Sequence, residues 1–109
     1  MQKDGVTIEK LFSPPALYAT LAIFFDYPDD SFCPRLIARQ TGTDKKSVAR
    51  ELRKLKGIGI LDGGPGGRGN AYWLNTEFPL YGELVSIFAK TRKSRRYPQS
   101  LSPFLEMLY

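Results

Sequence analysis

The 109-residue sequence predicts a mainly α fold with one small β-hairpin: an α+β class with a three-helix core, the hairpin and a C-terminal helix. Two observations support this expectation. Helix-start residues precede three short segments whose apolar side chains have helical spacing. Two β-prone runs then flank a glycine-rich stretch, and a fourth amphipathic segment follows. The length and an apolar content of 42% suit one domain with its own core.

The first predicted helix covers residues 13–26. Ser13 is a favourable N-cap, and Pro14 fits the first helical position, where its missing N–H removes no hydrogen bond. The helix is apolar almost all the way round, which indicates that more than one of its faces is covered. Either flanking segments of the chain or a second subunit would provide that cover. The apolar residues are Leu17, Tyr18, Leu21, Ala22, Ile23, Phe24 and Phe25.

A second and a third helix follow in quick succession. Residues 31–33 are expected to form a short strand or an extended link, after which Pro34 starts a helix that ends near Thr41. Gly42 allows a tight turn. Asp44 then caps a helix over residues 45–58, and Gly59 closes it because glycine adopts the left-handed conformation easily.

The hairpin and the last helix complete the predicted domain. Residues 60–61 and 71–74 are the two β-prone runs, joined by a long glycine-rich tip over residues 62–70. Pro79 opens an amphipathic helix with a stripe at i, i+4, i+7 and i+8, formed by Leu80, Leu84, Ile87 and Phe88. The chain therefore divides into an N-terminal extension (1–12), a folded domain (13–91), and a basic linker with a short C-terminal helix (92–109), which we expect to contribute to dimerisation.

Composition excludes several classes of chemistry. The sequence has no histidine, and its only cysteine is Cys33, so it provides no Ser-His-Asp or Cys-His pair and no thiolate metal cage. We expect neither an enzyme nor a cofactor or metal site. The longest apolar run, residues 16–25, is shorter than the roughly 20 residues that a bilayer requires. The N-terminus shows no secretory signal, which favours a cytoplasmic protein.

Charge is concentrated in the middle of the chain. Residues 31–70 hold nine Lys and Arg against three Asp and Glu, whereas residues 1–30 hold two against five. Such an asymmetry is typical of proteins that bind a polyanion.

The order of elements is that of a helix-turn-helix followed by a wing. A short helix, a glycine-containing turn and a basic helix form the first unit, and the hairpin behind it forms the wing. Residues 36–55, LIARQTGTDKKSVARELRKL, resemble winged helix-turn-helix transcriptional regulators of the arsenical-repressor and multiple-antibiotic-resistance type. The resemblance extends over about residues 13–90, through Gly59-Ile60-Leu61 and Tyr72, and implies this fold. The lack of histidine and of further cysteines departs from the metal-sensing members of the family.

The third helix can be analysed without that resemblance. At 100° per residue, Val48, Leu52 and Leu55 share one face. The opposite face holds three cations, which suits the DNA major groove. Ala49 is small enough for close approach, and Arg guanidinium groups match guanine O6 and N7. In the wing, Arg68 and Asn70 are expected at the backbone or minor groove. The predicted DNA-binding residues are Arg35, Thr43, Lys45, Lys46, Ser47, Ala49, Arg50, Arg53, Lys54, Arg68 and Asn70.

Two other readings of these motifs are rejected. Residues 64–69 match G-x-G-x-x-G but lead into a β-prone run rather than a helix, so no dinucleotide site is expected. Residues 45–50 also resemble the third helix of Z-DNA-binding Zα domains. Those domains have an asparagine where Ala49 stands, a tyrosine where Arg53 stands, and two prolines before the wing tryptophan, here Trp73. The chain lacks all three features.

The sequence thus predicts sequence-specific binding of double-stranded DNA by a homodimeric transcriptional regulator. The subunits are expected to pair through the first helix and the C-terminal segments. Two alternatives stay open: a winged-helix module for protein interaction or assembly, and an RNA-binding winged helix.

Overall fold

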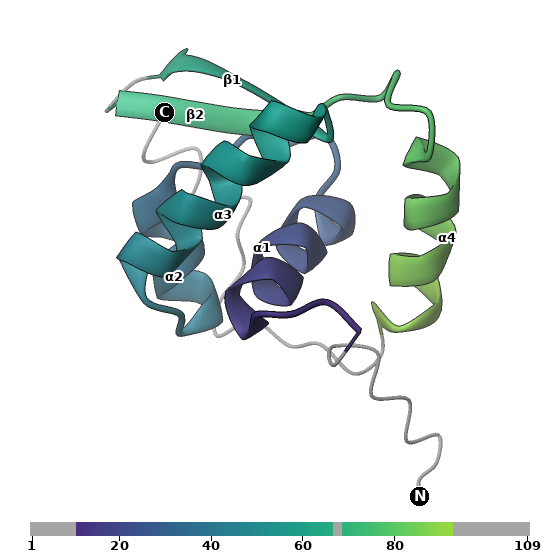
Figure 1. The fold of residues 1–109 in the computed structure, drawn as a ribbon, viewed down its shortest axis with the longest axis horizontal. Helices are drawn as coiled ribbons and strands as arrows, with labels where there is room; N and C mark the ends of the chain where they lie inside the picture. The colour runs from purple at the N-terminus through teal and green to yellow at the C-terminus, as the bar shows by residue number, and fades with distance from the viewer. Residues whose placement is uncertain (1–10, 67–68, 93–109) are drawn as a thin grey trace, which may run out of the picture.

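A computed structural model describes residues 11–66 and 69–92 of the chain. Its elements run in the order α1 (Pro15–Asp26), α2 (Pro34–Thr41), α3 (Lys45–Ile58), β1 (Leu61–Gly66), β2 (Gly69–Leu74) and α4 (Tyr81–Lys90) (Figure 1). Three helices followed by an antiparallel hairpin and a further helix form a winged-helix-like arrangement. The predicted α+β class is confirmed.

Helix α1 begins later than the sequence indicates. Pro14, with extended backbone, is the N-cap, Pro15 follows at the start of the helix, and no side chain caps the first turn. The prediction that Ser13 is the cap is therefore wrong. A residue that precedes proline avoids the α region, so Pro14 cannot enter the helix and Pro15 starts it instead.

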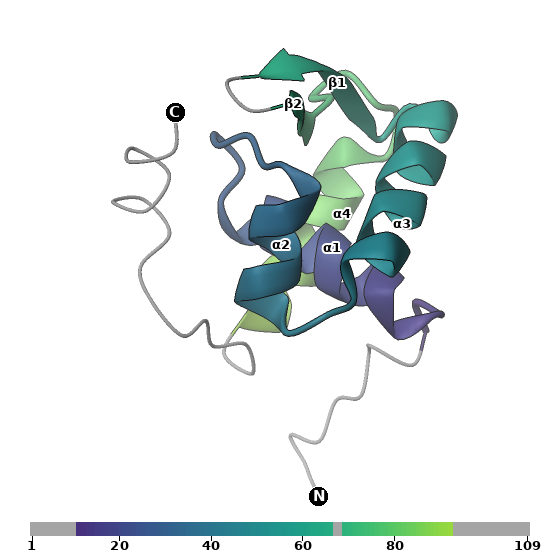
Figure 2. The same ribbon diagram turned by 90° about the vertical axis from the view of Figure 1, so that its left-hand side faces the viewer.

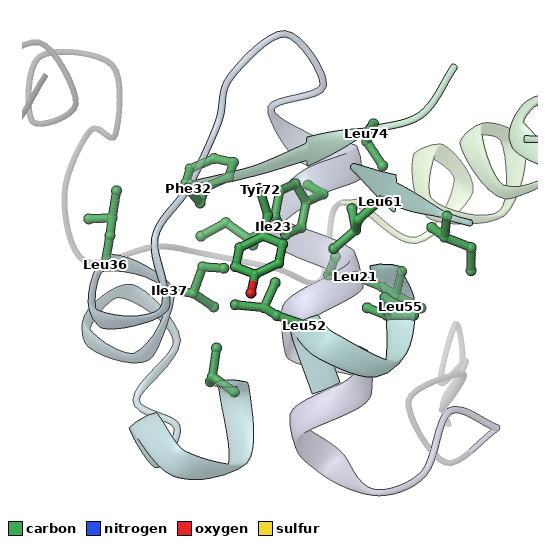
Figure 3. Close-up of a cluster of buried hydrophobic side chains, with 14 of the residues drawn as sticks. Leu21, Ile23, Phe32, Leu36, Ile37, Leu52, Leu55, Leu61, Tyr72 and Leu74 are labelled. Carbon is green, nitrogen blue, oxygen red and sulfur yellow. The ribbon is translucent and has the colours of Figure 1, made fainter. Parts of the chain in front are cut away.

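The core forms around α1, which lies between the α2–α3 pair and α4 (Figure 1). Phe24 meets Phe32 edge to face, with ring centroids 5.1 Å apart, and Phe25 stacks on Phe88 of α4 at 5.2 Å. Every α1 residue after Pro15 is buried or half-buried. The apolar side chains on all sides of α1 are therefore covered by flanking segments of the same chain. Figure 3 shows core side chains from α1, α2, α3 and both strands converging.

Helices α2 and α3 follow the predicted boundaries. Gly42 has φ 68° and Gly59 has φ 94°, both in the left-handed region, so each helix ends where glycine permits the turn. The backbone N–H of Thr43 donates to the carbonyl of Ala38 at 3.1 Å and closes the turn between the helices.

The hairpin is more regular than expected. Its pairs run from Leu61 opposite Leu74 to Gly66 opposite Gly69, so most of the glycine-rich stretch belongs to the ladder and only residues 67–68, which the structure does not describe, lie between the strands. The long tip expected over residues 62–70 is therefore wrong.

Packing against Tyr72 explains why position 63 of the hairpin is a glycine. A Cβ at Gly63 would lie 2.9 Å from the Tyr72 ring, so this register depends on a residue without a side chain.

Residues 31–33, expected as a short strand or an extended link, contain a single isolated β-bridge. Phe32 and Tyr72 exchange two backbone hydrogen bonds of 2.9 Å, and their neighbours do not continue the ladder. This bridge ties the start of α2 to the hairpin.

Helix α4 begins at Tyr81 rather than at Pro79. The side-chain Nδ2 of Asn75 donates to the carbonyl of Gly59 at 2.9 Å, and Oδ1 of the same side chain accepts from the Glu77 N–H at 3.0 Å. These bonds hold the segment before α4 in a turn against the end of α3. Leu80 is consequently the N-cap and 55% exposed, so its predicted place in the buried stripe is wrong. Phe88 is buried as expected.

No helix within the described ranges 11–66 and 69–92 is long and apolar enough to cross a membrane. Residues 1–10 of the predicted extension (1–12) and residues 93–109 of the predicted C-terminal segment (92–109) lie outside the described residues.

Candidate nucleic-acid interface

Helix α3 presents one buried and one charged face. Val48, Leu52 and Leu55 are each at most 1% exposed and pack into the core, as the spacing predicts. The predicted cations on the opposite face and its flanks are all exposed: Lys45, Lys46, Arg50, Arg53 and Lys54. Ala49 is half-buried at the flank of this face. The helix therefore carries a continuous basic surface over its first ten residues.

A hydrogen-bond chain fixes the start of that surface. The Asp44 carboxylate accepts from the Ser47 N–H at 2.9 Å and from the Ser47 hydroxyl at 3.2 Å. The Ser47 hydroxyl accepts from the Arg50 guanidinium at 3.3 Å. The backbone hydrogen bond from Ser47 is the main cause that holds the pKa of Asp44 below its ordinary value. Asp44 thus stays ionised at neutral pH, and Arg50 has a bonded partner on its own helix face.

Lys54 forms an ion pair with an acidic side chain of the same helix. Its ammonium lies 2.8 Å from Oε1 of Glu51, whose side chain is only 3% exposed. Glu51 is the one α3 acid on the buried side, and sequence reasoning did not single it out. The i, i+3 spacing of Glu51 and Lys54 is the signal that indicates such a pair. Lys54 therefore has less free charge to offer a ligand than Arg50 or Arg53.

The predicted residues of α2 and the turn take two kinds of position. Arg35 is exposed at the start of α2. Thr43 is half-buried, and its hydroxyl lies 2.9 Å from that of Thr41, which itself donates to the Ile37 carbonyl at 2.7 Å. Thr43 therefore braces the turn between α2 and α3.

The hairpin brings Asn70 to the same side of the molecule. Figure 2 shows α2 and α3 side by side, with the hairpin above them. Asn70 is exposed on β2, opposite Pro65, and shares a pocket of about 570 Å³ with Arg35 and Lys45. The other residues that line this pocket are Cys33 and Pro34. Arg68, the remaining wing candidate, lies outside the described residues.

Sequence reasoning missed this pocket because its lining comes from three separate segments. Cys33 and Pro34 carried no local signal for it, since the Phe32–Tyr72 bridge is what brings α2 and β2 together.

The geometry combines a basic helix face, a basic pocket and a hairpin on one side of the domain. Such a surface can bind an extended or compact polyanion. In residues 11–66 and 69–92, no group of three or more Asp, Glu, Cys or His side chains is arranged to hold a metal ion. A comparison with protein-family models found no matching model, and searches of curated proteins and of solved structures found no match either. The winged-helix-like arrangement therefore rests on the order and packing of the elements themselves.

Proposed function

We propose that this protein binds double-stranded DNA and reads its sequence as a transcriptional regulator, with α3 in the major groove. The single observation that supports this most strongly is the exposed cationic face of α3, directly opposite its buried stripe. An α-helix with its side chains is about 10–12 Å across, and the B-DNA major groove is about 12 Å wide.

Arg50 and Arg53 are the proposed base readers. They are three residues apart and both exposed, so they lie on neighbouring positions of one face. A guanidinium can bond O6 and N7 of guanine together, which a lysine cannot do with the same geometry. The hydrogen bond from Arg50 to Ser47 reduces the freedom of the Arg50 side chain before DNA arrives.

The remaining predicted residues are proposed to position the duplex. Lys45 and Lys46 lie in the first turn of α3, and both side chains are exposed, so their ammonium groups are proposed to contact phosphate. Asn70, with Arg68 of the hairpin, is proposed to contact the backbone or the minor groove. The proposal assigns no catalytic activity and no cofactor to the protein.

Dimerisation is part of the same proposal. Two copies paired through α1 and the C-terminal segments would present two α3 helices to a palindromic site, with half-sites about 34 Å apart. Because α1 is covered by its own chain, its contribution would come from half-buried side chains such as Leu17 and Tyr18. Sedimentation velocity tests the pairing: a monomer at all concentrations would contradict it. Such a regulator is proposed to act in the cytoplasm of a prokaryotic cell.

Fluorescence anisotropy with a duplex of about 25 bp tests DNA binding. We expect the logarithm of affinity to fall with the logarithm of salt, with a slope of about −0.9 per neutralised phosphate. Arg50→Glu should weaken binding strongly and flatten that slope. Lys56→Glu makes the same charge reversal on an exposed α3 residue outside the predicted set, and should have a much smaller effect. Equal losses in both variants, or no binding by folded wild-type protein at about 50 mM salt, would contradict the proposal.

The alternative of a protein-interaction module has one observation in its favour. Among the described residues, three large apolar side chains are more than half exposed: Leu11, Ile58 and Leu80. A module of this kind would keep its partner in Arg50→Glu and lose it in Ile58→Ser, the reverse of the DNA proposal. The RNA alternative is tested by a matched RNA duplex, which should bind more weakly than DNA.

A further inference from the structure

The pocket between α2, α3 and the hairpin has features that a DNA-binding face alone does not require. Its volume is about 570 Å³, within the range of roughly 300–1,000 Å³ typical of small-molecule sites. Of the described residues, five from three segments line it, so its shape depends on the fold rather than on one helix end.

The lining provides hydrogen-bond donors and positive charge. Arg35 and Lys45 are both cationic, Asn70 contributes an amide, and none of the lining residues that the structure describes is acidic. Within the described part of the chain, no acidic side chain forms an ion pair with either cation. By contrast, Lys54 on the same helix as Lys45 is neutralised by Glu51. The pocket therefore holds two charges that no acidic side chain of the described residues balances.

The start of α2 adds a third positive feature. Cys33 is its N-cap but makes no side-chain hydrogen bond to the first turn. At α3, by contrast, the Asp44 carboxylate accepts a hydrogen bond from the Ser47 N–H. The partial positive charge of the α2 N-terminus is thus not balanced by a capping side chain, and the first residues of that helix line the pocket.

We infer that this pocket binds a phosphorylated small molecule. A phosphate group carries the charge and the acceptor oxygens that a guanidinium, an ammonium and an amide can bond together. Pro34 and Cys33 are the uncharged, mainly apolar residues of the lining and can contact an organic moiety, and the volume exceeds that of one phosphate group. The ligand class is therefore an organic phosphomonoester of nucleotide size or smaller.

Ligand binding should also weaken DNA binding, and this second effect rests on the function proposed above. Lys45 belongs both to the pocket and to the first turn of α3. A bound phosphomonoester neutralises Lys45 and occupies the space between α2 and the hairpin, so it competes with the duplex. Binding of the small molecule itself does not depend on DNA.

Cys33 provides the readout, because it is the only cysteine in the chain and lines the pocket. The rate at which iodoacetamide, a neutral reagent, alkylates Cys33 is measured with and without adenosine monophosphate, at constant ionic strength. We expect alkylation to slow by a factor of 1 + [L]/Kd, about fivefold at four times Kd. Adenosine, which lacks the phosphate, should not slow it.

The matched variants are an Arg35→Ser/Lys45→Ser double variant and Lys56→Ser. All three side chains are exposed, so folding should persist, and thermal unfolding checks this. The ratio of rates with and without the nucleotide should fall to one in the double variant and stay unchanged in Lys56→Ser. No protection of wild-type protein at about 10 mM nucleotide, or equal protection in the double variant, would overturn the inference.

The same measurement with a DNA duplex distinguishes the two sources of phosphate, a small molecule and the DNA backbone. If a duplex protects Cys33 and the nucleotide does not, the pocket takes a backbone phosphodiester, and the small-molecule inference is wrong. If the nucleotide protects Cys33 but no duplex binds at any salt concentration, the inference stands and the proposed function fails. If both bind, the nucleotide should lower the apparent affinity for DNA in wild-type protein and not in the double variant.

Discussion

The Arg50 guanidinium donates a hydrogen bond to the Ser47 hydroxyl, 3.3 Å away and one turn earlier on α3. The same hydroxyl bonds the Asp44 carboxylate that caps the helix. The residue that starts α3 and the residue proposed to read DNA are therefore connected through one side chain. Loss of Ser47 should affect binding without unfolding the domain, because the Ser47 N–H still reaches Asp44.

Ser47→Ala should weaken DNA binding by about 2- to 10-fold, the worth of one hydrogen bond of about 0.5–1.5 kcal/mol. Anisotropy with the same duplex measures it. Ser86→Ala removes an exposed hydroxyl from α4 and serves as the control. Identical affinities for Ser47→Ala and wild type would mean that the contact does not position Arg50.

Lys54→Met should destabilise the fold, because it leaves the buried Glu51 carboxylate without its ion-pair partner. Loss of one member of a fully buried pair costs about 3–5 kcal/mol. Half of the Lys54 side chain is exposed to solvent, so we expect about 1–2 kcal/mol. Urea unfolding measures the difference.

Lys56→Met is the control for Lys54→Met, since Lys56 is exposed two residues further along the same helix. The loss at Lys54 should also shrink in a Glu51→Gln background, where no buried charge remains. Equal destabilisation by the two lysine substitutions would show that the pair does not support α3.

Gly63→Ala should destabilise the hairpin, since the new Cβ would lie 2.9 Å from Cδ2 of the buried Tyr72 ring. Overpacking of this kind costs about 1–3 kcal/mol. Gly57→Ala is the matched control: nothing lies within 4 Å of its Cβ position, and alanine favours the helix interior. Thermal unfolding should show a lower melting temperature for the first variant and an equal or higher one for the second.

Acid should selectively remove the contribution of Asp44 to stability. Its pKa is lowered in the folded state, mainly by the hydrogen bond from the Ser47 N–H. The stabilisation is therefore complete above the ordinary pKa of 3.8 and is lost as pH falls through the lowered value. Asp44→Asn should reduce the free energy of unfolding at neutral pH, and the deficit should disappear in strong acid.

The pKa of Asp30 is shifted in the direction opposite to that of Asp44. Burial, and then the neighbouring Asp29, raises its pKa. Its ionised form is disfavoured in the folded state, so Asp30→Asn should increase stability at neutral pH and have no effect below the pKa. A denaturation series against pH that showed the same sign for both substitutions would contradict these assignments.

Local signals determine how much of this structure could be predicted. Asp44 and Gly59 give the boundaries of α3 because caps act within a few residues. The pairing of Gly63 with Tyr72, in contrast, depends on the register of two strands and on the core beneath them. The exposed position of Leu80 does not follow from local spacing, because Asn75 bonds the distant Gly59 carbonyl and keeps the chain in a turn.

The candidate site likewise has features that local spacing predicts and features that depend on long-range contacts. The exposed positions of Arg50 and Arg53 follow from the helical spacing of the apolar residues on the opposite face. The pocket that joins Arg35 to Asn70 could not be derived from spacing, since it depends on a bridge between segments 40 residues apart, Phe32 and Tyr72.

Amide chemical-shift mapping by NMR, with isotope-labelled protein and a duplex of about 25 bp, tests most directly whether α3 is the DNA-binding face. We expect the largest shifts at residues 45–54 and at Asn70, with little change in α4. Largest shifts along α4 and around Ile58, with residues 45–54 unmoved, would contradict it.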